Sequence, residues 1–294
     1  MNKIAFFVPG ARHYDNGLYQ NSANSFVNIS ITASECQCCC EHCKGQLLKS
    51  MLAATEPELL VDLATDLHGR GCRGILISGG ACQDGSVPLD RFAGALKHIA
   101  AMGLSVVVHP GLLAADTANL LAESNVTRVA LDLIGDSATI REVYHLKRTP
   151  ADYQNSLRAA RLASLKVCPH IVIGLHYGKI RGEYEALKMV AAEGAESLVL
   201  VMLNPLQNTP MGGVTPPPLE SVAEIFKTAK QLLPNIPVAL GCARPPGNYS
   251  HAIERLAVEA GFNAIAYPAR ETVDYVLSLG YHITYQETCC GMFA

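Results

Sequence analysis

Eight short apolar runs with strand-like composition recur along the chain, and segments with a helical pattern separate them. The separating segments, such as 57–71 and 218–234, carry apolar residues at helical spacing and end at a glycine or a proline. Apolar strands joined by helical crossovers predict a parallel sheet covered by helices, and eight units fit an α/β fold of the TIM type, a (β/α)8 barrel that is closed or partly open. The runs are residues 26–32, 73–78, 104–109, 128–134, 167–175, 197–203, 236–242 and 263–268.

This alternation also predicts the domain organisation. We expect an N-terminal extension over residues 1–25, one barrel domain over 26–280, and a cysteine-containing C-terminal tail over 281–294 that lies across the mouth of the barrel. In βα barrels the loops at the C-terminal ends of the strands carry the chemistry, so we expect the functional site at that end.

The composition argues against nucleic acid or a membrane as the partner. Apolar residues make up 49% of the chain, charged residues 17%, and the net charge of -3 gives no basic field for a polyanion. The longest uncharged stretch, 197–219, holds five prolines and does not suit a membrane span. No signal-like segment precedes residue 35, so we expect a cytoplasmic, reducing location, where clustered cysteines are metal ligands or catalytic groups.

Residues 35–45 read ECQCCCEHCKG and hold five cysteines just after the first run. Only the set Cys36, Cys40 and Cys43 gives the spacing Cys-x3-Cys-x2-Cys, with Cys38 and Cys39 left between them. Three thiolates on one loop can hold three irons of a cubane 4Fe–4S cluster and leave the fourth iron open for chemistry. A structural zinc site is the alternative, although it needs a distant fourth ligand.

With this spacing after the first strand of a barrel, the sequence resembles the radical S-adenosylmethionine (SAM) superfamily. The resemblance implies that the open iron binds the methionine part of SAM, which is reduced and cleaved to a 5'-deoxyadenosyl radical. His42 matches the aromatic position near the adenine, and Ser78-Gly79-Gly80 resembles the turn whose backbone binds the methionine amine. The segment ending in Ile173 and Gly174 resembles the strand element near the adenine.

Three further polar residues stand at predicted strand ends. His109 and His176 are candidates for a hydrogen bond to the cofactor, with simple satisfaction by backbone groups as the alternative. Asp132 is a candidate contact for the ribose or amine of the cofactor. Asp136, four residues on, also fits the N-cap of the following helix.

Cys242 ends the seventh run, and the tail closes with ETCCGMFA, which contains Cys289 and Cys290. A tail folded over the mouth would bring these three thiols together for a second, auxiliary iron–sulfur cluster. The alternative is that Cys242 belongs to the core and the tail frays. Cys72 and Cys168 begin strands at the opposite end of the barrel and are predicted to be small buried residues.

The combination of CQCCCEHCKGQLLKSM, GILISGGACQDGSVPLDRF, VALDLIGDSATIREVYHLKRTPADY, HIVIGLHYGKIRGE and ALGCARPPG resembles the biotin-synthase-related group that includes one subunit of the two-component lipoyl synthases. This resemblance implies sulfur insertion into an octanoyl chain on a lipoyl carrier protein or domain. It implies a second radical SAM subunit and a low-potential electron donor as partners. Two alternatives stay open: a single-cluster radical SAM enzyme for rearrangement, methylation or metallocofactor assembly, and a non-catalytic metal-cluster binding module.

Overall fold

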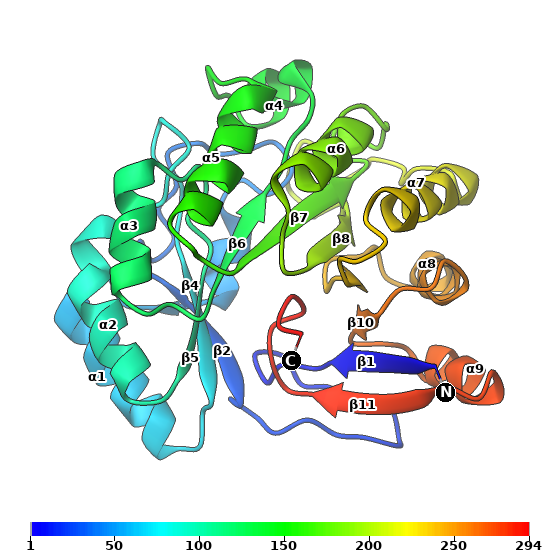
Figure 1. The fold of residues 1–294 in the computed structure, drawn as a ribbon, viewed down its shortest axis with the longest axis horizontal. Coiled ribbons are helices and arrows are strands. Elements are labelled where there is room, and N and C mark those ends of the chain that lie inside the picture. The colour runs from blue at the N-terminus through cyan, green and yellow to red at the C-terminus, as the bar shows by residue number, and fades with distance from the viewer. Residues whose placement is uncertain (1, 294) are drawn as a thin grey trace.

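The computed structural model describes residues 2–293, and it has the expected α/β fold with a curled, all-parallel sheet. All eight expected strands form, and three more join them (Figure 1). The sheet order is β11-β1-β10-β9-β8-β7-β6-β5-β4-β2-β3, and within residues 2–293 no ladder joins β11 to β3, so the barrel is open. The strands are β1 (Lys3–Phe7), β2 (Phe26–Ser30), β3 (Leu52–Ala53), β4 (Gly74–Ser78), β5 (Ser105–Val108), β6 (Arg128–Asp132), β7 (Val167–Ile173), β8 (Leu198–Met202), β9 (Val238–Leu240), β10 (Ala264–Ala266) and β11 (His282–Gln286).

Helices cover the outside of the curl (Figure 1). In α7 the buried residues Val222, Ile225, Phe226 and Ala229 recur at helical spacing, as a helix packed on a sheet requires. The helices are α1 (Pro57–Gly69), α2 (Ala93–Ala101), α3 (Ala115–Glu123), α4 (Ser137–Val143), α5 (Pro150–Leu162), α6 (Glu183–Glu193), α7 (Leu219–Leu232), α8 (Asn248–Glu259) and α9 (Arg270–Ser278), with short 3-10 helices η1 (Gln46–Ser50) and η2 (Asp90–Phe92). None of the helices in the described chain combines the length and the apolar character that crossing a membrane requires.

The central strands contribute to two apolar cores because their side chains alternate between the faces of the sheet. In β8, Leu198 and Leu200 pack in the large core between sheet and helices. Their neighbours Val199 and Val201 pack in a second core on the other face, together with Phe7 of β1 and Cys290 of the tail. The inside of the curl is therefore filled partly by the chain's own C-terminal segment.

The sheet reaches beyond the barrel segment 26–280 at both ends. β1 lies within the expected N-terminal extension, and it pairs with β10 on one side and β11 on the other. β11 lies within the expected tail, and the chain after it turns into the space that the sheet encloses (Figure 1). Only the last part of the expected tail, after Gln286, lies outside the sheet.

Candidate active site

The cysteine loop follows β2, and Thr32 connects it to the turn after β4. The hydroxyl of Thr32 accepts a hydrogen bond from the backbone N–H of Gly80 at 2.7 Å and donates one to the carbonyl of Glu35 at 2.9 Å. Further along, Cys39 and Lys44 take left-handed backbone angles, with φ of 42° and 46°. These turns fold the loop back on itself, so that residues close in sequence face a common space.

Gly80 allows the loop to lie directly against the end of β4. A Cβ atom at this position would stand 1.9 Å from the carbonyl oxygen of Glu35 and 2.5 Å from Cα of Cys36. Both neighbours are backbone atoms and cannot rotate away. Gly79 similarly faces the side chain of Thr32. The two glycines thus have a packing role, and their contact with a methionine amine stays a prediction.

Four of the five loop cysteines, Cys36, Cys38, Cys40 and Cys43, line one cavity. A hydrogen bond to Cys38, together with burial, raises the pKa of the Cys40 thiol well above its usual range. Cys39 is set aside: it is exposed, and its Sγ lies 3.1 Å from the carbonyl oxygen of Cys36. The lining thiols therefore include the set with the Cys-x3-Cys-x2-Cys spacing.

These thiols do not converge on one point. In the part of the chain that the structure describes, no three His, Cys, Asp or Glu side chains are grouped to hold a metal ion. A cubane cluster makes a different demand, because each thiolate binds its own iron atom. Cys36, Cys40 and Cys43 line the same cavity, and their binding of such a cluster stays a prediction.

The cavity beside the thiols has a volume of about 270 Å³. Polar groups reach it from several strand ends, including Ser78 of β4, His109 after β5 and Asp132 of β6. The Ser78 hydroxyl already uses its donor within the protein, because it donates to the carbonyl oxygen of His109 at 2.9 Å. The remaining lining is largely apolar and includes Leu47, Leu48, Met51, Leu76, Val87, Leu112 and Leu146.

His109, Asp132 and His170 are three titratable residues that lie close together on the inner side of β5, β6 and β7. The Nε2 atom of His109 lies 3.5 Å from Oδ1 of Asp132, and the rings of His109 and His170 are 6.0 Å apart. Burial disfavours charge on His109, but the Asp132 carboxylate outweighs it and raises the pKa of His109. Burial, followed by repulsion from His109, lowers the pKa of His170 to about 4. Asp132 therefore favours the protonated form of His109, whereas His170 is neutral at neutral pH.

His42 is half-buried, and desolvation lowers the pKa of its imidazole. Its Nδ1 atom has no hydrogen-bond partner within the described chain, and its ring lies 5.3 Å from that of Tyr144. A buried polar atom without a partner costs free energy, so this nitrogen calls for a ligand group or water in the cavity that His42 lines. This observation fits a cofactor bound next to the three thiols.

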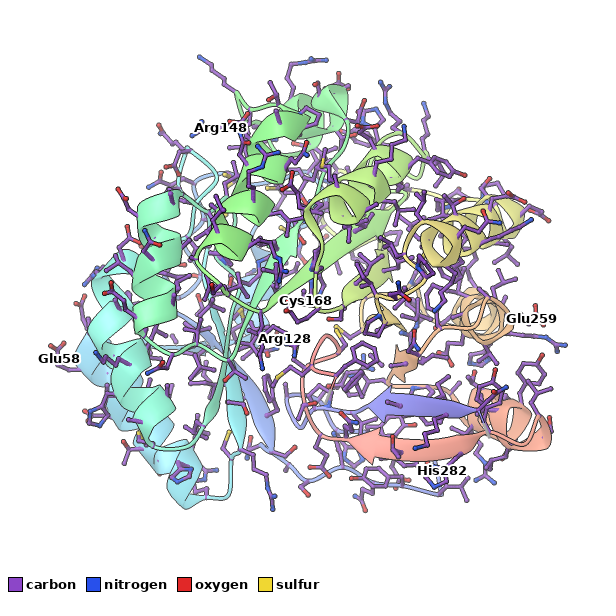
Figure 2. The ribbon with its side chains drawn as sticks, viewed as in Figure 1. Glu58, Arg128, Arg148, Cys168, Glu259 and His282 are labelled. Carbon is purple, nitrogen blue, oxygen red and sulfur yellow. The ribbon has the colours of Figure 1, made fainter. Side chains whose placement is uncertain are left out.

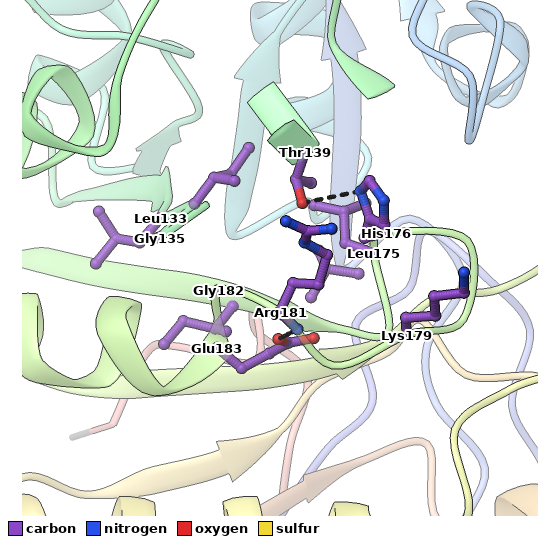
Figure 3. Close-up of a pocket in the computed structure, with 12 residues that line it drawn as sticks. Leu133, Gly135, Thr139, Leu175, His176, Lys179, Arg181, Gly182 and Glu183 are labelled. Carbon is purple, nitrogen blue, oxygen red and sulfur yellow. Dashed lines mark hydrogen bonds between the residues drawn. The ribbon is translucent and has the colours of Figure 1, made fainter. Parts of the chain in front are cut away.

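Three predicted site residues lie elsewhere. His176 is buried beside a small cavity, where its Nδ1 lies 3.2 Å from the hydroxyl of Thr139 (Figure 3). The N–H of Gly174 donates to Glu183 at 2.8 Å, and Ile173 is fully buried in the core between sheet and helices. None of His176, Ile173 and Gly174 lines the cavity of the cysteine loop.

These three residues lie away from the cavity because side chains alternate along β7 and because of the path of the loop that follows it. Ile173 points to the helices because His170 and Val172 take the other face. Asp136, the other option weighed at the end of β6, is the N-cap of α4, where its carboxylate accepts from the N–H of Thr139 at 2.7 Å.

The structure brings Cys242, Cys289 and Cys290 together. Cys242 follows β9, the other two follow β11, and the thiol of Cys290 forms hydrogen bonds with both partners. Cys242 is exposed, and the hydrogen bond with Cys290 lowers its pKa to about 6, with the nearby Arg244 and Arg12 acting in the same direction. The tail thus carries its two thiols to Cys242, and their binding of an auxiliary cluster stays a prediction.

Of the tail thiols, Cys289 lies nearest the cavity of the cysteine loop. Cys289 packs against the same apolar group as Leu76, and Leu76 also lines the cavity. Cys289 is also close enough to His109 to contribute to the rise of its pKa. The two sets of thiols are thus separated by the cavity and by the residues of its floor.

Arg244 fixes the segment that carries Cys242. Its guanidinium is buried, pairs with the carboxylate of Glu254 at 3.0 Å, and donates to the carbonyl of Ala266 at 2.8 Å. A further bond reaches the carbonyl of Gly241, the residue before Cys242.

Two residues of this region escaped the sequence reasoning. His170 stands in the run VCPHIVI, where a polar residue between apolar ones on the same face as Cys168 is the signal that was available. Arg128 is the first residue of β6 and is buried inside the curl, although a charged residue at a strand start usually indicates an exposed position. Its role is considered below.

Comparisons with known proteins agree with this site. No family model matches the chain. A biotin synthase of Zymomonas mobilis is 23% identical over 261 residues, which covers 87% of this chain and 76% of that protein. Among solved structures, methylornithine synthase (PylB) superposes with a TM-score of 0.62 at 15% identity, covering 88% of this chain and 82% of that chain. The FeFe-hydrogenase maturase HydG from Carboxydothermus hydrogenoformans gives a TM-score of 0.61 at 15% identity, covering 96% and 68%.

The structural likenesses establish the fold. The sequence match to a biotin synthase, together with the cysteine loop and its cavity, supports the radical SAM superfamily.

Proposed function

We propose that this protein is a radical SAM iron–sulfur enzyme that inserts sulfur into an octanoyl chain carried by a lipoyl carrier protein or domain. A second radical SAM subunit and a low-potential electron donor act with it, in the cytoplasm. The observation that carries the proposal is the meeting of Cys242 with Cys289 and Cys290, of which Cys289 packs in the same apolar group as Leu76 of the cavity lining.

Cys36, Cys40 and Cys43 would hold the first 4Fe–4S cluster, and Cys242, Cys289 and Cys290 an auxiliary one. With SAM bound, the first cluster supplies the radical that removes hydrogen from an unactivated carbon. His42, with its unpartnered Nδ1, would contact the cofactor, as would Ser78, His109 and Asp132, which line the same cavity. The leucine-rich lining excludes water and suits an aliphatic chain.

The proposal is tested by measuring iron and sulfide after anaerobic reconstitution of the native chain and two triple alanine variants. One variant replaces Cys36, Cys40 and Cys43, and the other replaces Cys242, Cys289 and Cys290. We expect about eight irons per native chain and about four in each variant, as two cubane clusters require. Sulfur transfer to an octanoylated carrier peptide, detected by mass spectrometry, then tests the substrate.

A native chain with about four irons, all lost in the first variant, would contradict the auxiliary cluster. That result would favour the single-cluster alternative, with a rearrangement, methylation or metallocofactor-assembly reaction. Two clusters without sulfur transfer to the carrier peptide would contradict only the substrate.

A further inference from the structure

Arg128 lies inside the curl and contacts the tail directly after its two cysteines. Its Nη1 donates to the carbonyl oxygen of Gly291 at 2.9 Å, and its Nη2 reaches the carbonyl oxygen of Phe293 at 3.4 Å. Figure 2 shows Arg128 and Cys168 close to the C-terminal segment. Gly291 is the residue after Cys290, so this arginine holds the peptide that positions the thiols.

The charge of Arg128 is buried without an acidic side chain beside it. The residue is 7% exposed, and no acidic side chain of the described chain forms an ion pair with it. Glu196, an acid of the same region, pairs with Arg161 at 3.2 Å and accepts from the N–H of Val167 at 2.9 Å. The Nε atom of Arg128 has no hydrogen-bond partner among residues 2–293.

Such a charge is costly to bury unless an anion faces it. Arginine stays protonated in proteins, so it cannot escape the cost by losing its proton. A buried, unpaired charge is strongly destabilising, and folded proteins avoid it. Among the described residues near Arg128, Glu196 is already paired with Arg161, and the other groups that can carry negative charge are two thiols. They are Cys168, whose pKa burial raises while Arg128 opposes that rise, and beyond it Cys289.

Two further contacts hold the tail at Gly291: a hydrogen bond and a close approach to a cysteine side chain. Ser197 donates a hydrogen bond to the same carbonyl oxygen of Gly291 at 2.8 Å. A Cβ atom at position 291 would lie 2.0 Å from Sγ of Cys168, so only glycine allows this contact. Arg128, Cys168 and Ser197 come from the starts of β6, β7 and β8, and together they form a seat for the residue after Cys290.

We propose that Arg128 is a positioning residue of the auxiliary site: it fixes the tail that carries Cys289 and Cys290, and its buried positive charge compensates the negative charge of the thiolate-bound cluster. The inference rests on the proposed auxiliary cluster. It assigns a role to a buried charge that forms no ion pair with a side chain of residues 2–293.

The seat is tested without any cluster. In the reduced, cluster-free chain, Cys290 is buried, so a thiol-alkylating reagent should modify it slowly, as followed by mass spectrometry of the C-terminal peptide. Arg128→Gln should accelerate modification of Cys290 and leave that of buried Cys72 unchanged. Arg141→Gln, at an exposed side chain, is the matched control and should change neither rate. Equal Cys290 rates in Arg128→Gln and native protein would overturn the seat.

The charge is tested in the reconstituted protein by comparing Arg128→Lys with Arg128→Gln. Lysine keeps the charge and loses the forked hydrogen bonds, whereas glutamine keeps a donor and loses the charge. We expect Arg128→Gln to lose the iron held by the tail thiols, or to bind that cluster with a more negative reduction potential than Arg128→Lys does. Equal iron content and equal potential in both variants would overturn the charge role.

Failure of the proposed function gives a different result. If the native chain holds about four irons, the auxiliary cluster is absent, and the charge role fails with it. The alkylation rates of Cys290 then still decide whether Arg128 seats the tail.

Discussion

The cysteine loop and the tail site each bring three thiols together, but they do so by different means. Cys36, Cys40 and Cys43 lie on one loop between β2 and η1, so the local chain sets their spacing. Cys242 comes from the end of β9, and Cys289 and Cys290 come from the tail after β11, so the folded barrel must bring them together. The spacing of the loop cysteines can therefore be recognised as a sequence motif. The meeting of Cys242 with the tail thiols depends instead on tertiary contacts made at the other end of the barrel.

The largest expected effect is on the cleavage of SAM, which should require the thiols of the cysteine loop but not those of the tail site. Replacing Cys36, Cys40 and Cys43 with alanine should abolish cleavage of SAM, because the open iron that binds it is lost. Replacing Cys242, Cys289 and Cys290 should leave SAM cleavage in place and abolish sulfur transfer. Formation of 5'-deoxyadenosine, measured by chromatography, checks both variants, and loss of cleavage in both would show that the two sites do not act separately.

Gly80→Ala tests the packing of the cysteine loop. The new Cβ would clash with the backbone of Glu35 and Cys36, and overpacking of this kind costs about 1–3 kcal/mol. We expect loss of the iron held by the loop and retention of the iron held by the tail. Gly94→Ala, where nothing lies within 4 Å of the added atom, is the control and should lower neither stability nor iron content. Full iron content in Gly80→Ala would contradict the packing role.

Gly291→Ala tests the tail in the same way. Its Cβ would clash with Sγ of Cys168, so we expect loss of the tail iron and destabilisation of about 1–3 kcal/mol in urea unfolding. Cys168→Ala removes that sulfur, and the double variant should recover much of the loss. Gly213→Ala, with open space around it, is the control. If the double variant is no better than the single one, the tail is not seated on Cys168.

A smaller effect is expected from His170, which should make the stability of the folded protein depend on pH. Its pKa of about 4 lies below the usual value of 6.5, so the folded protein favours the neutral ring, and stability present above pH 6.5 is lost as the pH falls toward 4. The loss at pH 5 is on the order of 2 kcal/mol. His170→Gln should remove most of this slope.

The raised pKa of His109 acts in the opposite sense, because it adds stability at low pH that is lost as the pH rises. His98→Gln, at an exposed residue of α2, is the control. Urea midpoints between pH 5 and 8 check the prediction, and an unchanged slope in His170→Gln would contradict it.

The smallest effect is expected at Cys39. The residue is exposed and its side chain is set apart from the cavity, so Cys39→Ala should leave iron content and SAM cleavage at native values and change stability by less than about 0.5 kcal/mol. Loss of iron in this variant would show that Cys39 replaces a member of the Cys36, Cys40 and Cys43 set.

The sequence by itself determined the eight strands, the helices between them and the loop that carries Cys36, Cys40 and Cys43. These features depend on local periodicity and on spacing within one segment, which the fold does not alter. The sequence also placed Ser78, His109 and Asp132 at the mouth, because each ends a strand or directly follows one.

Only the tertiary structure decided the rest. The path of the chain after β7 places His176 and Gly174 away from the cavity. The pairing of β1 with β10 and β11 adds strands from both end regions of the chain to the sheet. The contact of Arg128 with Gly291 joins residues far apart in sequence. Contacts of this kind depend on where the barrel places its strands relative to the tail, and no local pattern records that distance.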